Sequence, residues 1–248
     1  MTRRGLLRGG LFLAGAWALM ARPWSWGRAD DITTEPLEGL APFRRLLNGQ
    51  TVSGGGSGTT DTILLGLDAP DPVDPALDAR LRADLTQVLW GDWGGRSPVP
   101  VTYFTDIRCP ICRPLEARLR AIEGIALTTR EFPVFGEVSE LAARAIVTAQ
   151  QQGLGERMRL RLQRSAFALG REGVFQVAEG AGVDTVQFAA DFDGPQVTAR
   201  LAEDRALARI FRLPGTPGLI VARTRVIGAP SDATLQALIA EEAGLGRP

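Results

Sequence analysis

The two cysteines of the 248-residue chain lie three positions apart, as Cys109-Pro110-Ile111-Cys112. An apolar run ends just before them and a helical pattern follows, so we predict that the pair lies at a strand-to-helix turn. Two thiols at this spacing can cycle between a dithiol and a disulfide. No third cysteine competes for either sulfur. This motif is therefore the predicted centre of any chemistry that the chain performs.

The composition excludes several other kinds of site. The chain has no histidine and no lysine, and all 28 basic residues are arginine. Ser–His and Cys–His catalysis, Schiff-base chemistry and histidine metal sites are thereby ruled out. A zinc site normally takes four cysteine or histidine ligands, and two cysteines do not supply them. No glycine-rich phosphate loop follows a strand, so we expect neither a metal nor an organic cofactor.

Residues 1–29 have the pattern of an export signal. Three arginines precede an apolar run over residues 11–21, which is typical of a signal peptide. The run is short for a membrane span, which needs about 20 apolar residues. The Arg3-Arg4 pair resembles the twin-arginine type of signal. We predict cleavage after Ala29, and the alternative is an uncleaved anchor that holds the protein at the membrane.

Cleavage there would also change the charge of the chain. It would remove five arginines and no acid, leaving 23 arginines against 28 acids, a net charge of about −5. A mildly acidic protein without a basic run binds nucleic acid poorly, so no such partner is expected. A disulfide across so small a ring adds little stability in the loop-entropy model. The cysteine pair is therefore predicted to be reactive rather than structural.

Residues 30–97 are predicted to form an N-terminal extension without a chemical motif. Glycine and serine, or proline and aspartate, dominate residues 53–58 and 68–72, which predicts irregular segments. Residues 63–65 suggest a short strand, and residues 78–89 have the apolar spacing of a helix. The simpler expectation is that this extension packs on the main domain. The alternative is a segment for substrate docking or for forming a homodimer.

Residues 98–135 are predicted to form a β-α-β unit around the cysteines. Its strands are expected over residues 99–105 and 125–132. Pro110 suits the first turn of the intervening helix, whereas Pro114 inside that helix predicts a kink. Apolar residues recur at the spacing of a core-facing helix: Ile111, Leu115, Leu119 and Ile122.

The next stretch, residues 137–212, is predicted to be helical almost throughout. Ser139 and Asp184 are expected to be the N-caps of two of its helices. After it, a β-hairpin over residues 219–227 and a helix over residues 233–243 complete the order, before a short tail at residues 244–248. The helices expected in the block cover residues 140–151, 157–167, 174–181, 185–192 and 195–211.

This order of elements, together with two short motifs, resembles the DsbA-like branch of the thioredoxin superfamily. The motifs are Tyr103-Phe104-Thr105-Asp106-x-x-Cys109-Pro110-Ile111-Cys112 and Gly215-Thr216-Pro217. The resemblance covers roughly residues 80–243. It implies an α/β thioredoxin-like fold over residues 98–243, with the family's helical insertion at about residues 137–205.

The resemblance also implies roles for the motif residues. Cys109 is expected at a helix N-terminus, where unpaired N–H groups favour a thiolate, and Cys112 is expected one turn further in as the buried, resolving thiol. The Thr216-Pro217 peptide bond is expected to be cis and to face the cysteines, which leaves the Thr216 backbone free to pair with an extended substrate. Many relatives have a histidine between the cysteines. Because Ile111, which follows Pro110, brings no charge, the disulfide is expected to be less oxidising.

A second departure from the family pattern concerns the proton of the resolving thiol. Thioredoxin-like proteins often place a buried carboxylate where this chain has Tyr103, and tyrosine, with a pKa near 10, is a poor substitute. Asp106 is one candidate shuttle, directly or through water, and its alternative is a solvated carboxylate at the strand end. Glu131 on the adjacent strand is the other candidate.

The resemblance as a whole implies a periplasmic thiol–disulfide oxidoreductase acting on cysteines of exported proteins, in the oxidising direction. A membrane or periplasmic redox partner would recycle the cysteine pair. The alternative within the same chemistry is a reductase or isomerase, for example in cytochrome maturation. The alternative of another class is a thioredoxin-fold binding module or chaperone without redox turnover.

Overall fold

The computed structural model describes residues 32–47, 74–95, 97–165 and 170–247. The predicted export signal and the strand suggested over residues 63–65 lie outside this part of the chain. The helices and strands are β1 (Thr34–Pro36), β2 (Arg44–Leu46), α2 (Pro75–Ala83), α3 (Leu85–Trp90), β3 (Val99–Thr105), α4 (Cys112–Arg120), β4 (Ile125–Glu131), α5 (Glu137–Gln151), α6 (Gly155–Ser165), α7 (Arg171–Ala181), α8 (Thr185–Asp191), α9 (Pro195–Ile210), β5 (Gly218–Val221), β6 (Thr224–Ile227) and α10 (Asp232–Leu245).

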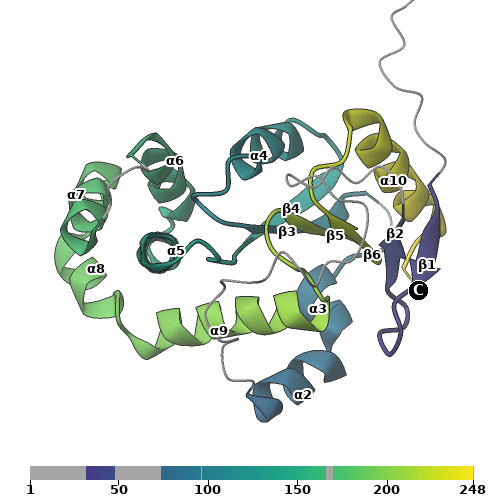
Figure 1. Ribbon diagram of the computed structural model, residues 1–248, viewed down its shortest axis with the longest axis horizontal. Helices are drawn as coiled ribbons and strands as arrows, with labels where there is room; N and C mark the ends of the chain where they lie inside the picture. Colours follow the sequence, from purple (N-terminus) through teal and green to yellow (C-terminus); the bar gives the residue numbers. More distant parts are fainter. Residues whose placement is uncertain (1–31, 48–73, 96, 166–169, 248) are drawn as a thin grey trace, which may run out of the picture.

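The described strands form one mixed sheet in the order β1-β2-β6-β5-β3-β4 (Figure 1). Strand β3 pairs in parallel with β4 and antiparallel with β5, and β5 and β6 form an antiparallel hairpin. Strand β2 lies parallel to β6, so the N-terminal strands extend the sheet beyond this hairpin. All seven residues of β3 are buried, as is usual for a strand that is covered on both faces.

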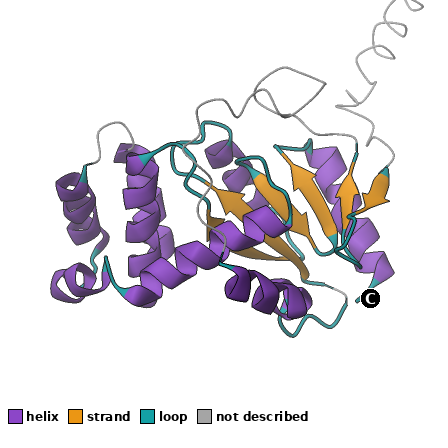
Figure 2. Ribbon diagram, turned by 60° about the horizontal axis from the view of Figure 1, so that its bottom comes forward, coloured by secondary structure: helices purple, strands orange, loops and turns teal. Residues whose placement is uncertain are grey.

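Helices cover both faces of the sheet. Helices α4 and α10 lie on one face, and α3 and the C-terminal part of α9 lie on the other (Figure 1). Helices α5 to α8 form a block beside the sheet (Figure 2), and α2 contacts α3 and α9. This arrangement is the α/β thioredoxin-like fold with a helical insertion that the sequence predicts.

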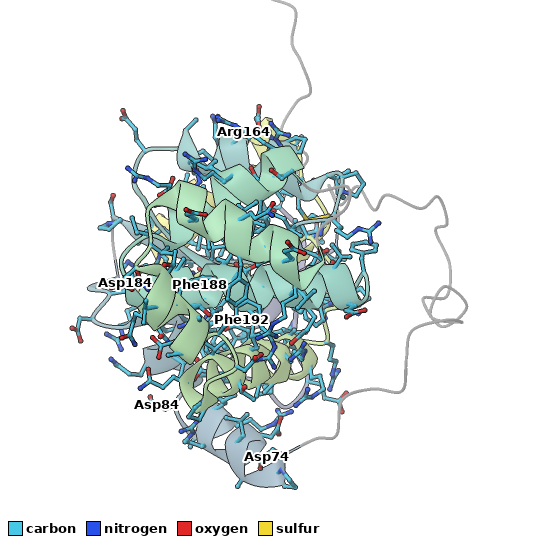
Figure 3. The ribbon with its side chains drawn as sticks, turned by 90° about the vertical axis from the view of Figure 1, so that its left-hand side faces the viewer. Asp74, Asp84, Arg164, Asp184, Phe188 and Phe192 are labelled. Atoms are coloured by element: carbon cyan, nitrogen blue, oxygen red, sulfur yellow. A yellow bond between two sulfur atoms is a disulfide. The ribbon has the colours of Figure 1, made fainter. Side chains whose placement is uncertain are left out.

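The helical block has its own apolar core. The rings of Phe175, Phe188 and Phe192 meet with centroid distances of 5.1 to 5.7 Å, and the last two lie close together in Figure 3. Asp184 caps α8 as predicted, because its carboxylate accepts hydrogen bonds from the backbone N–H groups of Val186 and Gln187. The predicted helices that correspond to α6, α7, α8 and α9 agree with the structure to within three residues at each end.

The start of α5 corrects one prediction. The helix begins at Glu137 rather than at residue 140, and Gly136, not Ser139, is its N-cap. The Ser139 hydroxyl instead donates a hydrogen bond to Asp106. The prediction that Ser139 lies near the start of a helix is confirmed, but its hydroxyl binds Asp106, which belongs to another segment of the chain, instead of capping the helix.

The predicted kink at Pro114 has no cause in the structure. Helix α4 is continuous, and Pro114 is its third residue. The first helical hydrogen bond of this turn runs from the Leu115 N–H to the Ile111 carbonyl. Because the N–H groups of the first helical residues have no partner within a helix, a proline at this position removes no hydrogen bond.

The single helix predicted over residues 78–89 is two helices. Helix α2 ends at Ala83 and α3 begins at Leu85, and between them Asp84 has φ −141° and ψ 36°, outside the helical region. Aspartate has a low helix propensity, so the apolar spacing alone overestimates the length of the helix.

The described parts of the predicted N-terminal extension pack on the main domain. The Phe43 ring lies 5.6 Å from the Trp90 ring and 4.9 Å from the Phe211 ring, measured between centroids. The Arg44 guanidinium pairs at 2.8 Å with the fully buried carboxylate of Glu242 on α10. Strands β1 and β2 thus belong to the same sheet as the main domain, and β2, α2 and α3 contribute residues to the same apolar core.

Candidate active site

Cys109 and Cys112 are joined by a disulfide between the end of β3 and the start of α4, with their Cα atoms 5.3 Å apart. Both are buried, at 4% and 1% exposure. The regular helix begins at Cys112, and the Cys112 N–H donates a hydrogen bond to the Cys109 carbonyl at 3.2 Å. Cys112 is therefore the first residue of the helix rather than one turn inside it, because Pro110 and Ile111 form the turn that precedes α4. The positive end of the α4 dipole still lies at the cysteine pair.

The loop between α9 and β5 lies against the cysteine pair. Its Thr216-Pro217 peptide bond is cis, as the resemblance implies. The Thr216 carbonyl oxygen lies 3.6 Å from Cys109 Sγ. The Pro217 carbonyl accepts a hydrogen bond from the Gly228 N–H, which ties this loop to the end of β6. Two segments more than 100 residues apart in sequence are thus brought together at the Cys109 sulfur.

Asp106, the first candidate for the proton shuttle, is a buried clamp for the surrounding loops. It is only 3% exposed, so it is not the solvated carboxylate considered as its alternative. One carboxylate oxygen accepts hydrogen bonds at 2.7 Å from the Arg108 N–H and the Ser139 hydroxyl. The other accepts from the N–H groups of Val134 and Phe135. These four bonds hold together the segments before Cys109, after β4 and at the start of α5.

Glu131, the second candidate, belongs to a buried charge cluster under α4. In the parallel register Glu131 lies opposite Thr105, and Tyr103, two residues earlier, is on the same face of the sheet. The Arg159 guanidinium from α6 donates hydrogen bonds to both oxygens of Glu131. It also lies 3.6 Å from Glu116 on α4. We call Glu116, Glu131 and Arg159 the buried charge cluster.

Tyr103 connects this cluster to the cysteines. Its hydroxyl donates a hydrogen bond of 2.8 Å to the Cys112 carbonyl oxygen. Burial raises the pKa of Tyr103 above its ordinary value, so the phenol stays neutral. Burial also raises the pKa of Glu131, to about 7, and the charge of Arg159 opposes this rise. A carboxylate with such a pKa is present in both protonation states near neutral pH.

Two members of the cluster do not appear among the candidates chosen from the sequence. Glu116 lies four residues after Cys112, and residues at this spacing share one face of a helix. Its place on the same face as Cys112 could therefore have been predicted from the sequence. Arg159 lies 47 residues after Cys112, and its place under the cysteines depends on how α6 packs against α4. Nothing in its local sequence indicates that contact.

Replacing Glu131 with glutamine should remove a pH dependence of the stability. The carboxylate has a pKa of about 7 when folded and about 4.3 when unfolded. The protonated group is favoured in the folded state. This contribution to the free energy of unfolding is fully present below pH 4.3 and is lost as the pH rises through 7. A shift of this size corresponds to about 4 kcal/mol. Urea unfolding from pH 5 to pH 8 measures this loss. A pH profile that is the same in Glu131→Gln and the wild type would contradict the assignment, and Glu137→Gln, at an exposed glutamate, is the matched control.

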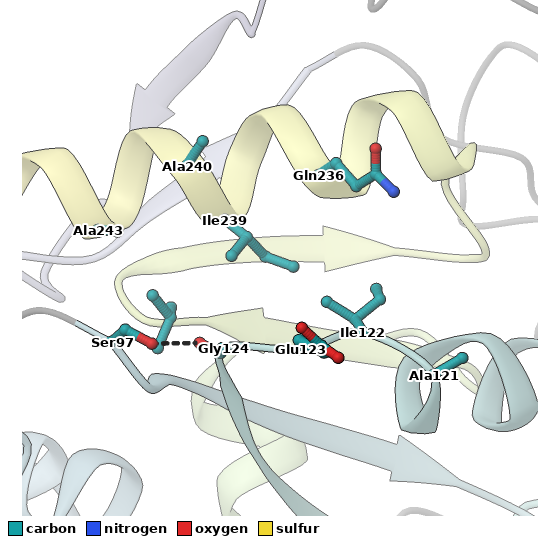
Figure 4. Close-up of a pocket in the computed structure, with 10 residues that line it drawn as sticks. Ser97, Ala121, Ile122, Glu123, Gly124, Gln236, Ile239, Ala240 and Ala243 are labelled. Atoms are coloured by element: carbon teal, nitrogen blue, oxygen red, sulfur yellow. Dashed lines mark hydrogen bonds between the residues drawn. The ribbon is translucent and has the colours of Figure 1, made fainter.

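A shallow cavity of about 440 Å³ lies between α10 and the segment after α4 (Figure 4). Ile122 and Ile239 point into it from opposite sides, and Ser97 lies at one end. None of the cysteine or proline motif residues lines it.

Within the described ranges, no helix is both long enough and apolar enough to cross a membrane.

Comparisons with known proteins agree with this geometry. The family model of the DSBA-like thioredoxin domain matches residues 100–240. A thioredoxin-like oxidoreductase from Silicibacter pomeroyi DSS-3 is 34% identical, with a TM-score of 0.51 over 57% of this chain and 84% of that one. The thiol-disulfide exchange protein alpha-DsbA2 from Wolbachia pipientis is 18% identical, with a TM-score of 0.54 over 67% of this chain and 95% of that one. The catalytic domain of Proteus mirabilis ScsC is also 18% identical, with a TM-score of 0.55 over 67% and 98%. No curated protein matches the chain.

The two structures at 18% identity support the fold alone, whereas the family model covers more than half of the chain. The matched range includes both cysteines and the Thr216-Pro217 loop, and the structure brings these together at one sulfur. The chain therefore belongs to the DSBA-like thioredoxin domain family and is a thiol–disulfide oxidoreductase.

Proposed function

We propose that the protein oxidises cysteine pairs in exported polypeptides by transferring its Cys109–Cys112 disulfide to them. The observation that carries the proposal is the disulfide at the positive end of α4, with a backbone carbonyl beside Cys109. A helix N-terminus stabilises a thiolate, and a stabilised thiolate makes the corresponding disulfide more oxidising. In the described residues, the polar neighbour of Cys109 Sγ is the Thr216 carbonyl and not a carboxylate.

The exchange proceeds in two balanced steps. A substrate thiolate attacks Cys109 Sγ, the Cys109–Cys112 bond breaks, and Cys112 takes the electron pair as a thiolate. A second substrate thiolate then attacks the substrate sulfur of the mixed disulfide, and Cys109 leaves as a thiolate. The substrate loses two electrons, and the protein is left as a dithiol. A partner that accepts these two electrons restores the disulfide.

Glu131 is proposed as the group that supplies a proton to the departing Cys112 sulfur. With a pKa of about 7 it holds a proton in a large part of the molecules near neutral pH. Tyr103 holds the Cys112 backbone, and Arg159 fixes the carboxylate of Glu131. Asp106, whose oxygens accept four hydrogen bonds, is proposed as a positioning residue for the loop before Cys109.

The Thr216-Pro217 loop is proposed as the place where the substrate backbone pairs. Thr216 is partly exposed and Pro217 is buried, so the loop presents its threonine beside the disulfide. An extended substrate that adds to this backbone would place its cysteine at Cys109. The pattern of residues 1–29 supports action on proteins outside the cytoplasm, in the periplasm.

A reductase or isomerase is the second candidate, and Ile111 favours it. This uncharged side chain between the cysteines adds nothing to thiolate stability at Cys109. A less stabilised Cys109 thiolate makes the disulfide less oxidising. It also makes the thiolate more nucleophilic, so Cys109 is a better attacking group.

The reduction potential of the cysteine pair separates the two directions. We would equilibrate the protein in glutathione buffers, trap thiols by alkylation and measure the oxidised fraction, with Cys112→Ser as the one-thiol reference. A potential of about −120 to −150 mV is expected for an oxidase. A potential of about −250 mV or lower would contradict the oxidase and favour the reductase. A pair that does not titrate would favour the binding module without redox turnover.

A further inference from the structure

Three arginine side chains are almost fully buried in the described residues. Arg130, Arg159 and Arg225 are 5%, 2% and 8% exposed. Arg130 pairs with Asp204 at 2.8 Å, and Arg159 pairs with Glu131. Arg225 forms no ion pair with any described residue. Because a buried charge is costly unless it is paired, Arg225 is the exception that requires an explanation.

The contacts of Arg225 satisfy only part of its guanidinium. One terminal nitrogen, Nη1, donates hydrogen bonds to the carbonyls of Phe211 and Arg212, at 3.0 and 3.3 Å. These carbonyls lie just after the C-terminal end of α9, where partial negative charge stabilises a cation. The Nε–H group is buried and has no hydrogen-bond partner. Buried donors are almost always paired, so the edge formed by Nε and Nη2 lacks an acceptor.

The surroundings of Arg225 add further positive charge. Arg45 lies directly beside it in the β2–β6 register, and Arg212 is exposed at the end of α9. Burial first, and then the charges of these two arginines, lower the pKa of Arg225. Glu35 pairs with Arg45 at 2.6 Å, and Arg212 donates a hydrogen bond to the backbone carbonyl of Glu38. Among the described residues, Glu35 is the one carboxylate that pairs with any of these three arginines.

We propose that Arg225, with Arg212 and Arg45 beside it, binds an oxyanion, either a phosphate or a carboxylate. The free Nε–Nη2 edge presents two parallel N–H donors, the geometry that matches two oxygens of such a group. The anion supplies both the missing acceptor and the missing negative charge.

This site is separate from the buried charge cluster. Arg225 lies opposite Ile220 in the sheet, whereas Tyr103 lies opposite Leu219. Neighbouring residues of a strand point to opposite faces, so Arg225 is on the face away from α4. The site nevertheless holds Phe211 and Arg212, which directly precede the loop that carries Thr216.

Thermal unfolding of the oxidised protein tests the proposal. Sodium phosphate and sodium acetate are titrated separately at pH 7, each against sodium chloride of equal ionic strength. We expect the unfolding temperature to rise with one or both oxyanions beyond the chloride control. Phosphate also stabilises proteins by exclusion from their surface, so only a rise that Arg225→Gln removes counts as binding. Such a rise with phosphate alone assigns a phosphate site, and with acetate alone a carboxylate site. The absence of both rises overturns the proposal.

Variants locate the response. Arg225→Gln should abolish the specific rise, whereas Arg80→Gln, which removes an exposed arginine on α2, should keep it. A specific rise that persists in Arg225→Gln overturns the site. If Arg225→Gln does not fold, Arg212→Gln decides the matter, because its side chain is exposed. In that variant the apparent dissociation constant for the anion, measured by calorimetric titration, should increase at least tenfold, and an unchanged constant overturns the proposal.

Discussion

Replacing Cys109 with serine is expected to abolish disulfide exchange and to leave the fold intact. Serine cannot form the disulfide that a substrate thiolate attacks, and the single remaining cysteine cannot complete a two-electron transfer. The small ring closed by the Cys109–Cys112 bond contributes little stability in the loop-entropy model. The measurement is the rate at which the protein introduces disulfides into a reduced, unfolded substrate, together with a far-ultraviolet circular dichroism spectrum.

Cys112→Ser is the informative companion of this variant. It keeps Cys109 as a free thiol and removes the resolving thiol. When the Cys109 thiolate attacks a substrate disulfide, one substrate sulfur leaves as a thiolate and the other stays bound to Cys109, so these mixed disulfides should accumulate and be visible by mass spectrometry. Exchange at the wild-type rate in Cys109→Ser would show that Cys109 is not the attacked sulfur. If the wild type shows no exchange, but it and Cys109→Ser suppress aggregation equally, the binding-module alternative is correct.

Replacing Arg159 with methionine is expected to destabilise the protein by about 3–5 kcal/mol. The change removes the cation that pairs with Glu131 and contacts Glu116, so Glu131 must either carry an unpaired buried charge or take up a proton. In a protein of this size that loss lowers the unfolding temperature by roughly 10 °C. Methionine retains most of the buried apolar volume, so the loss reports on charge rather than on a cavity. Urea unfolding at pH 7 measures it.

Two controls distinguish the charge effect from general damage under α4. Arg120→Met removes the other arginine that pairs with Glu116, but this side chain is one-third exposed, and a loss below about 1 kcal/mol is expected. The double variant Arg159→Met with Glu131→Gln should recover part of the loss, because Glu131 is the carboxyl group that loses its cation, whereas Glu116 keeps Arg120. Equal losses in Arg159→Met and Arg120→Met would contradict the buried charge cluster.

The elements around the cysteines could be predicted because their signals are local. Strand β3 was expected with its observed bounds, because a short apolar run rich in β-branched and aromatic residues indicates a buried strand. The position of the cis bond at Pro217 followed from a motif shared with a family. The signal for each of these features lies within a few consecutive residues, so the sequence alone is enough to read it.

The interactions that join distant segments could not be predicted in the same way. Strands β1 and β2 have three residues each, too few for any periodicity, and their pairing depends on a parallel partner near the C-terminus. Asp106 was chosen for its closeness to Cys109 in sequence, but its hydrogen-bond partners are loops that arrive from β4 and α5. Arg225 has the sequence context of an ordinary strand residue, and only the folded chain shows that no described carboxylate pairs with it.

The range matched by the family model has a consequence for how the protein can be divided. A fragment of residues 100–240 would lack β2, so the outer edge of β6 would present unpaired backbone groups. It would also lack Phe43 and Trp90, and thereby uncover the Phe211 ring that Phe43 contacts. Such a fragment would retain the cysteines but would tend to join edge to edge with copies of itself. We therefore expect a soluble fragment of this oxidoreductase to need β1 and β2, which cover the edge of β6, as well as the redox motif.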